Sequence, residues 1–162
     1  MSSSHFHLPT TLQLEVDIEV ADGRIIRSGL KRSVSEGISC QVQGASPELL
    51  NEIQLWLEDY GAGKQPAVRL PLSLEGLPPF ISHVLLALHE LPFGETLSYG
   101  ELAAQLFRPK AARAVGQACG RNPLILFIPC HRVLAANRKL GGFSADPSLK
   151  PLLLAHESVY LA

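Results

Sequence analysis

Cys130 and His131 are the neighbouring residues of this sequence best suited to chemistry. Only the thiolate form of a cysteine is a good nucleophile, and a nearby base can generate it. Pro129 fixes the backbone just before the cysteine, and an apolar run over residues 124–128 leads into it. Adjacent side chains of a strand point to opposite faces, so the pair needs a bend, a helical start or a bridging water to cooperate. A cysteine beside a histidine is more often structural, so the reactive interpretation depends on the rest of the chain.

Glu157, close to the end of the chain, adds a carboxylate to this pair. In a relay of thiol, imidazole and carboxylate, the carboxylate fixes the imidazole tautomer and the imidazole keeps the thiol ionised. A glutamate on a terminal helix is more often solvated, and only proximity to His131 would give it this role. The same three groups also suit a thiol hydrolase, which sequence spacing does not exclude.

The composition is typical of a folded protein. The 162 residues suffice for one ordinary domain or two small ones, and 46% of them are hydrophobic against 18% charged. No apolar run reaches membrane-spanning length and residues 1–11 lack the pattern of a signal peptide, so we expect a cytoplasmic protein without a membrane partner. Three cysteines without CxxC spacing argue against a disulfide framework or a zinc knuckle.

Charge is distributed unevenly between the two halves of the chain. Residues 1–76 hold six basic and ten acidic residues, a net charge of −4. Residues 77–162 hold eight basic and five acidic residues, a net charge of +3, and include Cys130. This asymmetry permits binding of a polyanion through the second half.

The first half predicts a small α/β domain. Strict alternation over residues 12–20 indicates a half-buried strand, and the turn at residues 21–23 allows residues 24–30 to return as its antiparallel partner. A third strand is expected over residues 38–42. Ser46 and Pro47 then begin a helix that stops at Gly61. The segment 63–79, rich in glycine and proline, is a candidate linker, although residues 71–74 could pack on either side.

The second half is expected to be mainly α-helical. A helical pattern covers residues 80–88, and Ser98 with Glu101 forms a capping box for a short helix. Pro109 is expected to start a second helix over residues 110–119 that Gly120 closes. Two short helices across a tight turn favour a helix-turn-helix. Residues 133–140 predict a hairpin or wing, and a last helix capped by Ser148 follows.

The predicted second helix of this pair is rich in small residues, so its backbone can approach a partner closely while Arg113 projects. Small residues also let helices pack tightly against one another, which is the alternative. The small residues are Ala111, Ala112, Ala114, Gly116 and Ala118.

From Leu91 to Val133 the chain resembles the O6-alkylguanine-DNA alkyltransferases, also called methylated-DNA–protein-cysteine methyltransferases. The matching segments are PFGET (92–96), SYGELA (98–103), KAARAVG (110–116), RNP (121–123), IPCHRV (128–133) and LLAHE (153–157). Residues 1–70 match only in general layout. The resemblance implies a ribonuclease-H-like α/β domain over residues 1–76 and a winged helix-turn-helix domain over residues 77–162.

The resemblance implies a role for each residue of the reaction. Cys130 would accept the alkyl group from O6 of guanine in a single irreversible displacement. His131 would act on the thiol through a water, with Glu157 behind it. Tyr99 would donate a proton toward N3 of the departing guanine. Asn122 would hold the turn beneath the cysteine.

It also implies how DNA is held. Arg113 would replace the flipped nucleotide in the base stack, with the small residues of its helix in the minor groove. From the residues alone, Arg138 and Lys139 at the basic tip of the predicted wing would contact phosphates. In the base pocket, the carbonyls of Cys130 and Val133 would accept from the guanine amino group and Ser144 would donate to O6. Phe143 stands in this pocket where many relatives carry a tyrosine.

The expected partner is therefore double-stranded DNA containing O6-alkylguanine, bound by a monomer without a cofactor. Some relatives hold zinc in their first domain, but the histidines and Cys40 of this chain show no ligand spacing, so we expect no metal. Two alternatives stay open. A winged-helix module could bind DNA and regulate without transferring anything, and a thiol hydrolase would turn over repeatedly.

Overall fold

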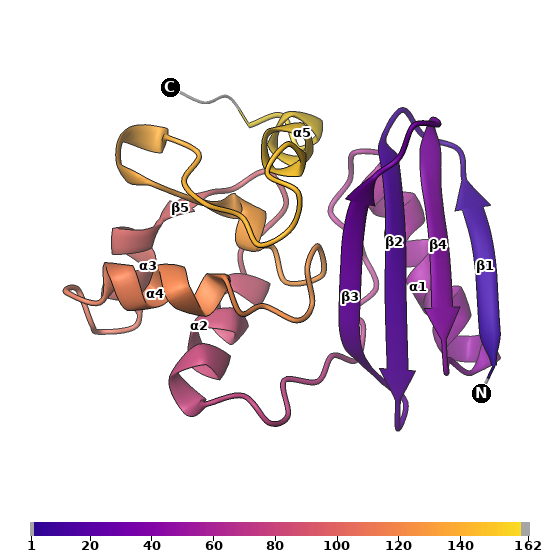
Figure 1. Ribbon diagram of the computed structural model, residues 1–162, viewed down its shortest axis with the longest axis horizontal. Helices are drawn as coiled ribbons and strands as arrows, with labels where there is room; N and C mark the ends of the chain where they lie inside the picture. Colours follow the sequence, from indigo (N-terminus) through magenta and orange to yellow (C-terminus); the bar gives the residue numbers. More distant parts are fainter. Residues whose placement is uncertain (1, 160–162) are drawn as a thin grey trace. The chain divides into compact units, whose positions relative to one another are not determined.

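The computed structural model describes residues 2–159 and separates into two compact units, Met1–Leu74 and Glu75–Ala162. The fold is α/β, with a small mixed sheet and, among the described residues, five α-helices (Figure 1). No helix among residues 2–159 is both long and apolar enough to cross a bilayer.

The first unit is a four-stranded sheet with one helix. Its spatial order is β1-β4-β2-β3. β2 and β3 form the expected antiparallel hairpin, whereas β4 runs parallel to β2 and β1 antiparallel to β4. The strands are β1 Ser3–Leu8, β2 Gln13–Ala21, β3 Arg24–Arg32 and β4 Gly37–Gln43. The predicted strands are confirmed. β1 was not predicted, because this edge strand has a weak apolar pattern and depends on pairing with a strand distant in sequence.

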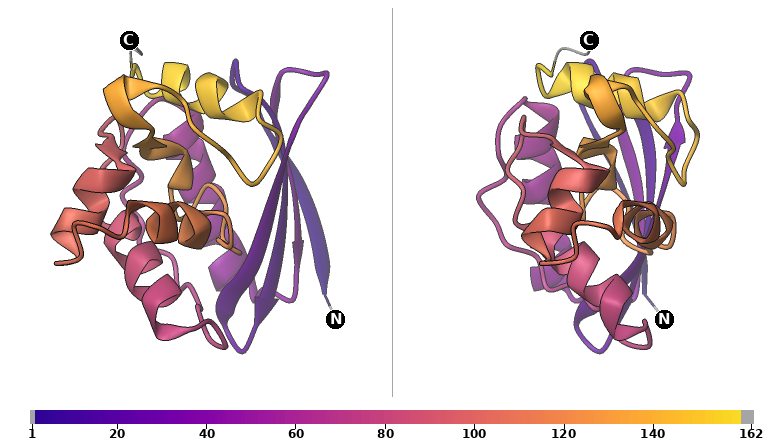
Figure 2. Two further views of the ribbon diagram at one scale, coloured as in Figure 1. Left: turned by 60° about the vertical axis from the view of Figure 1, so that its left-hand side comes forward. Right: turned by 90° about the vertical axis from the view of Figure 1, so that its left-hand side faces the viewer.

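One face of this sheet forms the core of the unit. Leu14, Val16 and Ile18 alternate with exposed acidic residues along β2 and are at most 1% exposed. The helix α1, Pro47–Gly61, packs against β1 and β4 and covers this face (Figure 2). It begins as predicted, because the Ser46 side chain accepts a hydrogen bond from the Leu49 N–H.

Part of the predicted linker is bound to the sheet of the first unit. The N–H of Ile25 donates to the Pro71 carbonyl and the N–H of Ser73 donates to the Ile25 carbonyl, each at 2.9 Å. Leu72 thereby forms a parallel bridge beside β3. Residues 71–73 therefore belong to the first unit, since they satisfy backbone groups at the edge of its sheet.

The second unit contains four helices and one very short sheet. Its capping box is confirmed: the Ser98 hydroxyl accepts from the Glu101 N–H at 3.0 Å and the Glu101 carboxylate accepts from the Ser98 N–H at 3.1 Å. β5 and β6 are parallel two-residue strands. The elements are α2 Pro79–His89, β5 Leu97–Ser98, α3 Tyr99–Gln105, α4 Ala112–Cys119, the 3₁₀ turn η1 Cys130–Arg132, β6 Val133–Leu134, the 3₁₀ turn η2 Ala136–Arg138 and α5 Leu149–His156.

One predicted helix start is wrong, whereas α5 begins directly after Ser148 as predicted but without the expected side-chain cap. α4 begins at Ala112 instead of Lys110, because residues 108–111 form a turn closed by the Ala111 N–H on the Arg108 carbonyl. Ser148 does not cap α5 with its side chain. The Asp146 carboxylate accepts from the Ser148 N–H at 2.9 Å instead, as aspartate commonly does in such turns.

The predicted hairpin over residues 133–140 is shorter than expected. β6 pairs with β5, and an isolated antiparallel bridge between Ala135 and Lys139 closes a tight turn. Asn137 and Arg138 in this turn have positive φ angles of 58° and 59°. Two consecutive left-handed residues form a tight hairpin turn, and the bridge between Ala135 and Lys139 is the pairing next to it, so the basic tip is a compact loop.

Candidate active site

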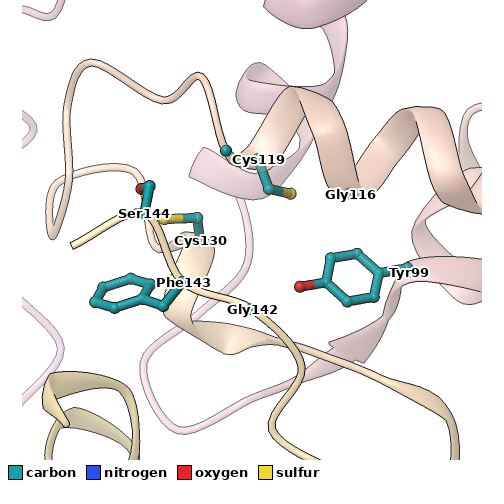
Figure 3. Close-up of a pocket in the computed structure, with 8 residues that line it drawn as sticks. Tyr99, Gly116, Cys119, Cys130, Gly142, Phe143 and Ser144 are labelled. Carbon is teal, nitrogen blue, oxygen red and sulfur yellow. The ribbon is translucent and has the colours of Figure 1, made fainter. Parts of the chain in front are cut away.

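Cys130 lies at a pocket of about 330 Å³ in the second unit (Figure 3). The pocket is formed where the start of α3, the end of α4, η1 and the loop over residues 142–144 meet. Its lining residues are Tyr99, Gly116, Cys119, Gly120, Cys130, Gly142, Phe143 and Ser144. The sequence predicted four of these for the reaction or the base pocket, Tyr99, Cys130, Phe143 and Ser144, and Gly116 for DNA binding.

A clamp of hydrogen bonds from Asn122 positions the cysteine. The Asn122 side chain donates to the Ile128 carbonyl and accepts from the Leu124 N–H, each at 2.9 Å. The Cys130 N–H also donates to the Ile128 carbonyl, at 2.8 Å. The apolar run before the cysteine is therefore a buried turn and not a strand, and η1 supplies the helical start that brings the thiol to the pocket.

The environment of the Cys130 thiol works in two directions. Burial raises its pKa, because a thiolate loses hydration in a site where the residue is 4% exposed. The hydrogen bond with Asn122, the charge of Lys150 and the hydrogen bond with Ser144 lower the pKa. The thiol therefore needs a base to ionise, and the pocket holds groups that stabilise the resulting charge.

Cys119 is a second thiol in the same pocket. Burial, followed by the nearby charge of Cys130, raises its pKa to about 12. Lys150 lowers the pKa of both thiols. Of the two, Cys130 also has side-chain hydrogen bonds, with Asn122 and Ser144, that lower its pKa further. Burial raises both pKa values, so what distinguishes the two thiols is the pair of side-chain hydrogen bonds that favours the thiolate of Cys130.

Tyr99 presents a protonated phenol to the pocket. Burial, together with the charges of Cys119 and Cys130, raises its pKa, so the hydroxyl is a donor at neutral pH. Its oxygen points into the pocket (Figure 3). Gly141 passes directly beside it with φ 68°, and a Cβ there would lie 3.3 Å from the phenol oxygen. Only glycine fits this position without displacing Tyr99.

His131 and Glu157 form the predicted contact. His131 Nε2 lies 2.6 Å from Glu157 Oε2, and both side chains are fully buried. Glu157 follows α5 as its C-cap residue, and its other oxygen accepts from Arg132 Nε at 2.7 Å and from the Gly94 N–H at 2.9 Å. Burial would raise the pKa of Glu157, but His131 and Arg132 lower it to about 2. The carboxylate therefore stays ionised.

The other nitrogen of His131 is left as a base. Burial lowers the His131 pKa, so the ring is neutral at neutral pH despite its contact with Glu157. A neutral ring that donates from Nε2 to the carboxylate carries a lone pair on Nδ1. His131 Nδ1 is the buried side-chain polar atom without a hydrogen-bond partner in the described part of the chain. The relay can accept a proton at this atom.

Lys150 is a site residue that the sequence analysis missed. It is 1% exposed, and Nζ donates to the Val133 carbonyl at 2.7 Å and to the Gly142 carbonyl at 2.9 Å. Nζ also lies 5.9 Å from the centre of the Tyr99 ring. Lys150 thus ties the segment after Cys130 to the loop that closes the pocket. The available signal was a lysine on the apolar stripe of α5 that Leu153 and Leu154 continue.

The sequence of this chain is similar to those of known methylated-DNA–protein-cysteine methyltransferases. The profile of the 6-O-methylguanine DNA methyltransferase DNA-binding domain matches residues 79–159. The methylated-DNA–protein-cysteine methyltransferase of Methanosarcina acetivorans is 44% identical over 110 residues, which cover 68% of this chain and 70% of that protein. The chain belongs to the 6-O-methylguanine DNA methyltransferase family. The constitutive methylated-DNA–protein-cysteine methyltransferase of Bacillus subtilis is 43% identical over 68% of this chain and 67% of its own length.

Solved structures of this methyltransferase family share the fold. Mycobacterium tuberculosis OGT in complex with DNA superposes with a TM-score of 0.68 and 31% identity, covering 88% of this chain and 92% of that one. The O6-methylguanine-DNA methyltransferase of Pyrococcus kodakaraensis superposes with a TM-score of 0.60 and 26% identity, covering 90% of this chain and 99% of that one. The α/β class predicted from the sequence is confirmed at this level.

The residues predicted to bind DNA lie on α4 and on the loop after β6, and all of them are exposed or partly exposed. Arg113 is exposed at the second position of α4, and Gly116, one turn later, lines the pocket. Ala111, Ala112 and Ala114 are partly exposed at the same end of α4. Arg138 and Lys139 are exposed on the compact loop after β6. Their DNA contacts stay predictions.

Two further expectations concern the Val133 carbonyl and metal binding. Val133 is buried and does not line the pocket, and its carbonyl already accepts from Lys150. A carbonyl has two lone pairs, so the predicted contact with the guanine amino group stays a prediction. Among residues 2–159, no three potential ligands gather in a way that could hold a metal ion.

Proposed function

We propose that this protein repairs DNA by moving the alkyl group of O6-alkylguanine onto Sγ of Cys130, once per molecule. The observation that carries the proposal is the arrangement around this sulfur. A buried thiol with two hydrogen-bonding side chains lies at a pocket, and the next residue is a neutral histidine tied to an ionised glutamate. A carbon–sulfur bond forms, the bond between O6 and the alkyl carbon breaks, and its electron pair leaves with the guanine.

His131 removes the thiol proton in this reaction. Nδ1 is its available basic atom, and the Glu157 carboxylate stabilises the positive ring that results. A water between Nδ1 and the thiol carries the proton. Lys150 favours the thiolate electrostatically from the same side of the pocket. The chain's own groups supply nucleophile and base, so no cofactor takes part.

Tyr99 assists the departure of the guanine. Its phenol donates a proton toward N3 of the purine as negative charge develops there. Ser144 donates to O6, and the carbonyls of Cys130 and Val133 accept from the exocyclic amino group. Phe143 forms the wall of the pocket beside the base. These contacts fix the alkyl carbon in line with the sulfur.

Reaction at a base inside a duplex requires the nucleotide to rotate out of the stack. We assign α3 and α4 to a helix-turn-helix and the loop over residues 135–139 to its wing. The small residues of α4 lie in the minor groove, Arg113 fills the space left by the nucleotide, and Arg138 and Lys139 contact phosphates. These groups come from one chain, which fits a monomer on double-stranded DNA.

The two domains of the proposal are residues 1–76 and residues 77–162. The first would be the ribonuclease-H-like domain, with its hairpin, parallel strand and covering helix. The second would hold the DNA surface and the acceptor cysteine.

The two pocket cysteines allow a matched test of the acceptor. Cys130→Ala is expected to abolish methyl transfer from a duplex containing O6-methylguanine while DNA binding persists. Cys119→Ala should retain transfer, because the side-chain hydrogen bonds that favour a thiolate act on Cys130 and not on Cys119. Radiolabelled methyl groups retained on the protein provide the measurement. Transfer by Cys130→Ala at the unaltered rate would overturn the assignment.

A further inference from the structure

The turn between α3 and α4 presents a phenylalanine in an unusual backbone conformation. Phe107 has φ 60° and is 93% exposed. Its N–H donates to the Ala104 carbonyl at 3.0 Å, and the Arg108 N–H donates to the Ala103 carbonyl at 2.9 Å. This pair of bonds ends a helix around one left-handed residue, a position that glycine usually occupies.

Stability does not account for this residue. A side chain at positive φ brings its Cβ close to the backbone, which disfavours every residue except glycine and, to a smaller extent, asparagine. The ring of Phe107 gains no compensating burial, since nearly all of it is exposed. A single exposed apolar side chain is ordinary, but one held in a disfavoured backbone conformation calls for a use outside the folding of the chain.

The surroundings of Phe107 identify the chemistry of a partner. No aspartate or glutamate occurs from Leu102 to Ala145. Six exposed cationic residues lie within this stretch: Arg108, Lys110, Arg113, Arg121, Arg138 and Lys139. A long stretch of chain with six exposed cations and no carboxylate favours a polyanion over a protein of mixed charge.

The turn between α3 and α4 is exposed at the end of the two helices and is anchored to α2. It projects beyond the ends of α3 and α4, at the end of α4 that carries Arg113 (Figure 1). The Arg108 guanidinium lies 5.4 Å from the centre of the Phe80 ring and thereby ties the turn to α2. Phe107 is thus presented from an anchored turn that leads into the end of α4 carrying Arg113, the residue assigned to nucleotide flipping.

We propose that Phe107 is a DNA-contacting residue whose ring packs against sugar and base-edge atoms in a groove of the duplex, next to the flipped nucleotide. The inference rests on the proposed function and extends its DNA surface. Such a contact is apolar, so it adds affinity that depends little on sequence or on salt. The neighbouring cations supply the salt-dependent part.

Replacement by glycine separates this role from any structural one. Phe107→Gly is expected to raise the melting temperature, because glycine suits the left-handed position. It should weaken binding to a short duplex about tenfold, the typical loss when an aromatic contact with nucleic acid is removed. The slope of log affinity against log salt concentration should stay unchanged, whereas Lys110→Ala should reduce that slope by about one.

Fluorescence anisotropy with a labelled duplex, with and without O6-methylguanine, measures both quantities. Phe107→Trp should keep the affinity, since it preserves an aromatic ring. Val34→Gly is the matched control, because Val34 is 98% exposed in a bend of the first unit. This control should bind like the unaltered protein.

The outcomes distinguish the inference from the proposed function. Phe107→Gly with unaltered affinity, in a protein that still binds DNA and takes up a methyl group, overturns the inference alone. The same result follows if Phe107→Gly loses affinity only through a changed salt slope, because the ring would then act through the cations. An unaltered protein that binds the duplex but never takes up a methyl group overturns the proposed function.

Discussion

The two units of this protein differ in what they bury. In the first unit, Ser28 is the buried polar or charged residue among those described, and the core is otherwise built from alternating strand positions and one helix face. In the second unit, five such residues are buried, and each lies in the segment around Cys130 or hydrogen-bonds to it: Asn122, His131, Arg132, Lys150 and Glu157. Burying polar groups is costly unless each finds a partner. The second unit therefore bears the energetic cost of burying polar groups around Cys130, whereas the first unit has an almost entirely apolar core.

Removal of a buried charge should show the largest difference between the units. Glu157→Ala leaves Arg132 and His131 without their carboxylate, and we expect a loss of about 3–5 kcal/mol in the free energy of unfolding. Glu19→Ala, on the exposed face of β2, is the matched control and should change little. Urea unfolding measures both. Equal effects of the two variants would contradict the comparison.

Acid should act on the second unit first. The pKa of Glu157 in the folded protein is about 2, below its ordinary value of 4.5, so its stabilising contribution is complete above 4.5 and is lost as the pH falls toward 2. Burial lowers the pKa of His131 below 6.5, so protonation below that pH also favours unfolding. No histidine or carboxylate is buried among the described residues of the first unit.

Two probes follow these units separately. Trp56, the one tryptophan of the chain, lies in α1 and reports on the first unit by fluorescence. Amide hydrogen exchange near His131 reports on the second. On acidification we expect the protection factor at His131, which corrects for the pH dependence of intrinsic exchange, to fall before the Trp56 signal changes. The opposite order would contradict the assignment of the acid-sensitive groups.

Replacement of Lys150 should have a smaller effect on stability and a clear effect on the thiol. Lys150→Met keeps the length of the side chain but leaves two carbonyls without their donor, which costs about 1–3 kcal/mol. It also removes a positive charge that lowers the pKa of Cys130, so the alkylation rate of this thiol should shift to higher pH. The pH profile of iodoacetamide modification measures the shift. An unshifted profile would limit Lys150 to a structural role.

Local signals in the sequence predicted much of this organisation. Alternation along residues 12–20 and the capping box of Ser98 and Glu101 each depend on neighbouring residues, and both are confirmed. The contact between His131 and Glu157 joins residues 26 apart, and the family resemblance implied it, whereas the residues alone left Glu157 open as a solvated side chain.

Features that depend on tertiary context were not predicted. β1 exists through its pairing with β4, and the amine of Lys150 is buried because two carbonyls distant in sequence converge on it. The need for glycine at position 141 comes from the Tyr99 ring. The start of α4 was misplaced because residues 108–111 form a turn before the helix begins at Ala112.

The intact mass of the protein after incubation with a duplex carrying one O6-methylguanine tests the central claim most directly. Our account predicts one added methyl group per chain, located on Cys130 by peptide mapping, with no further increase at excess substrate. An unchanged mass despite tight binding to the lesion, or a methyl group on another residue, would contradict it.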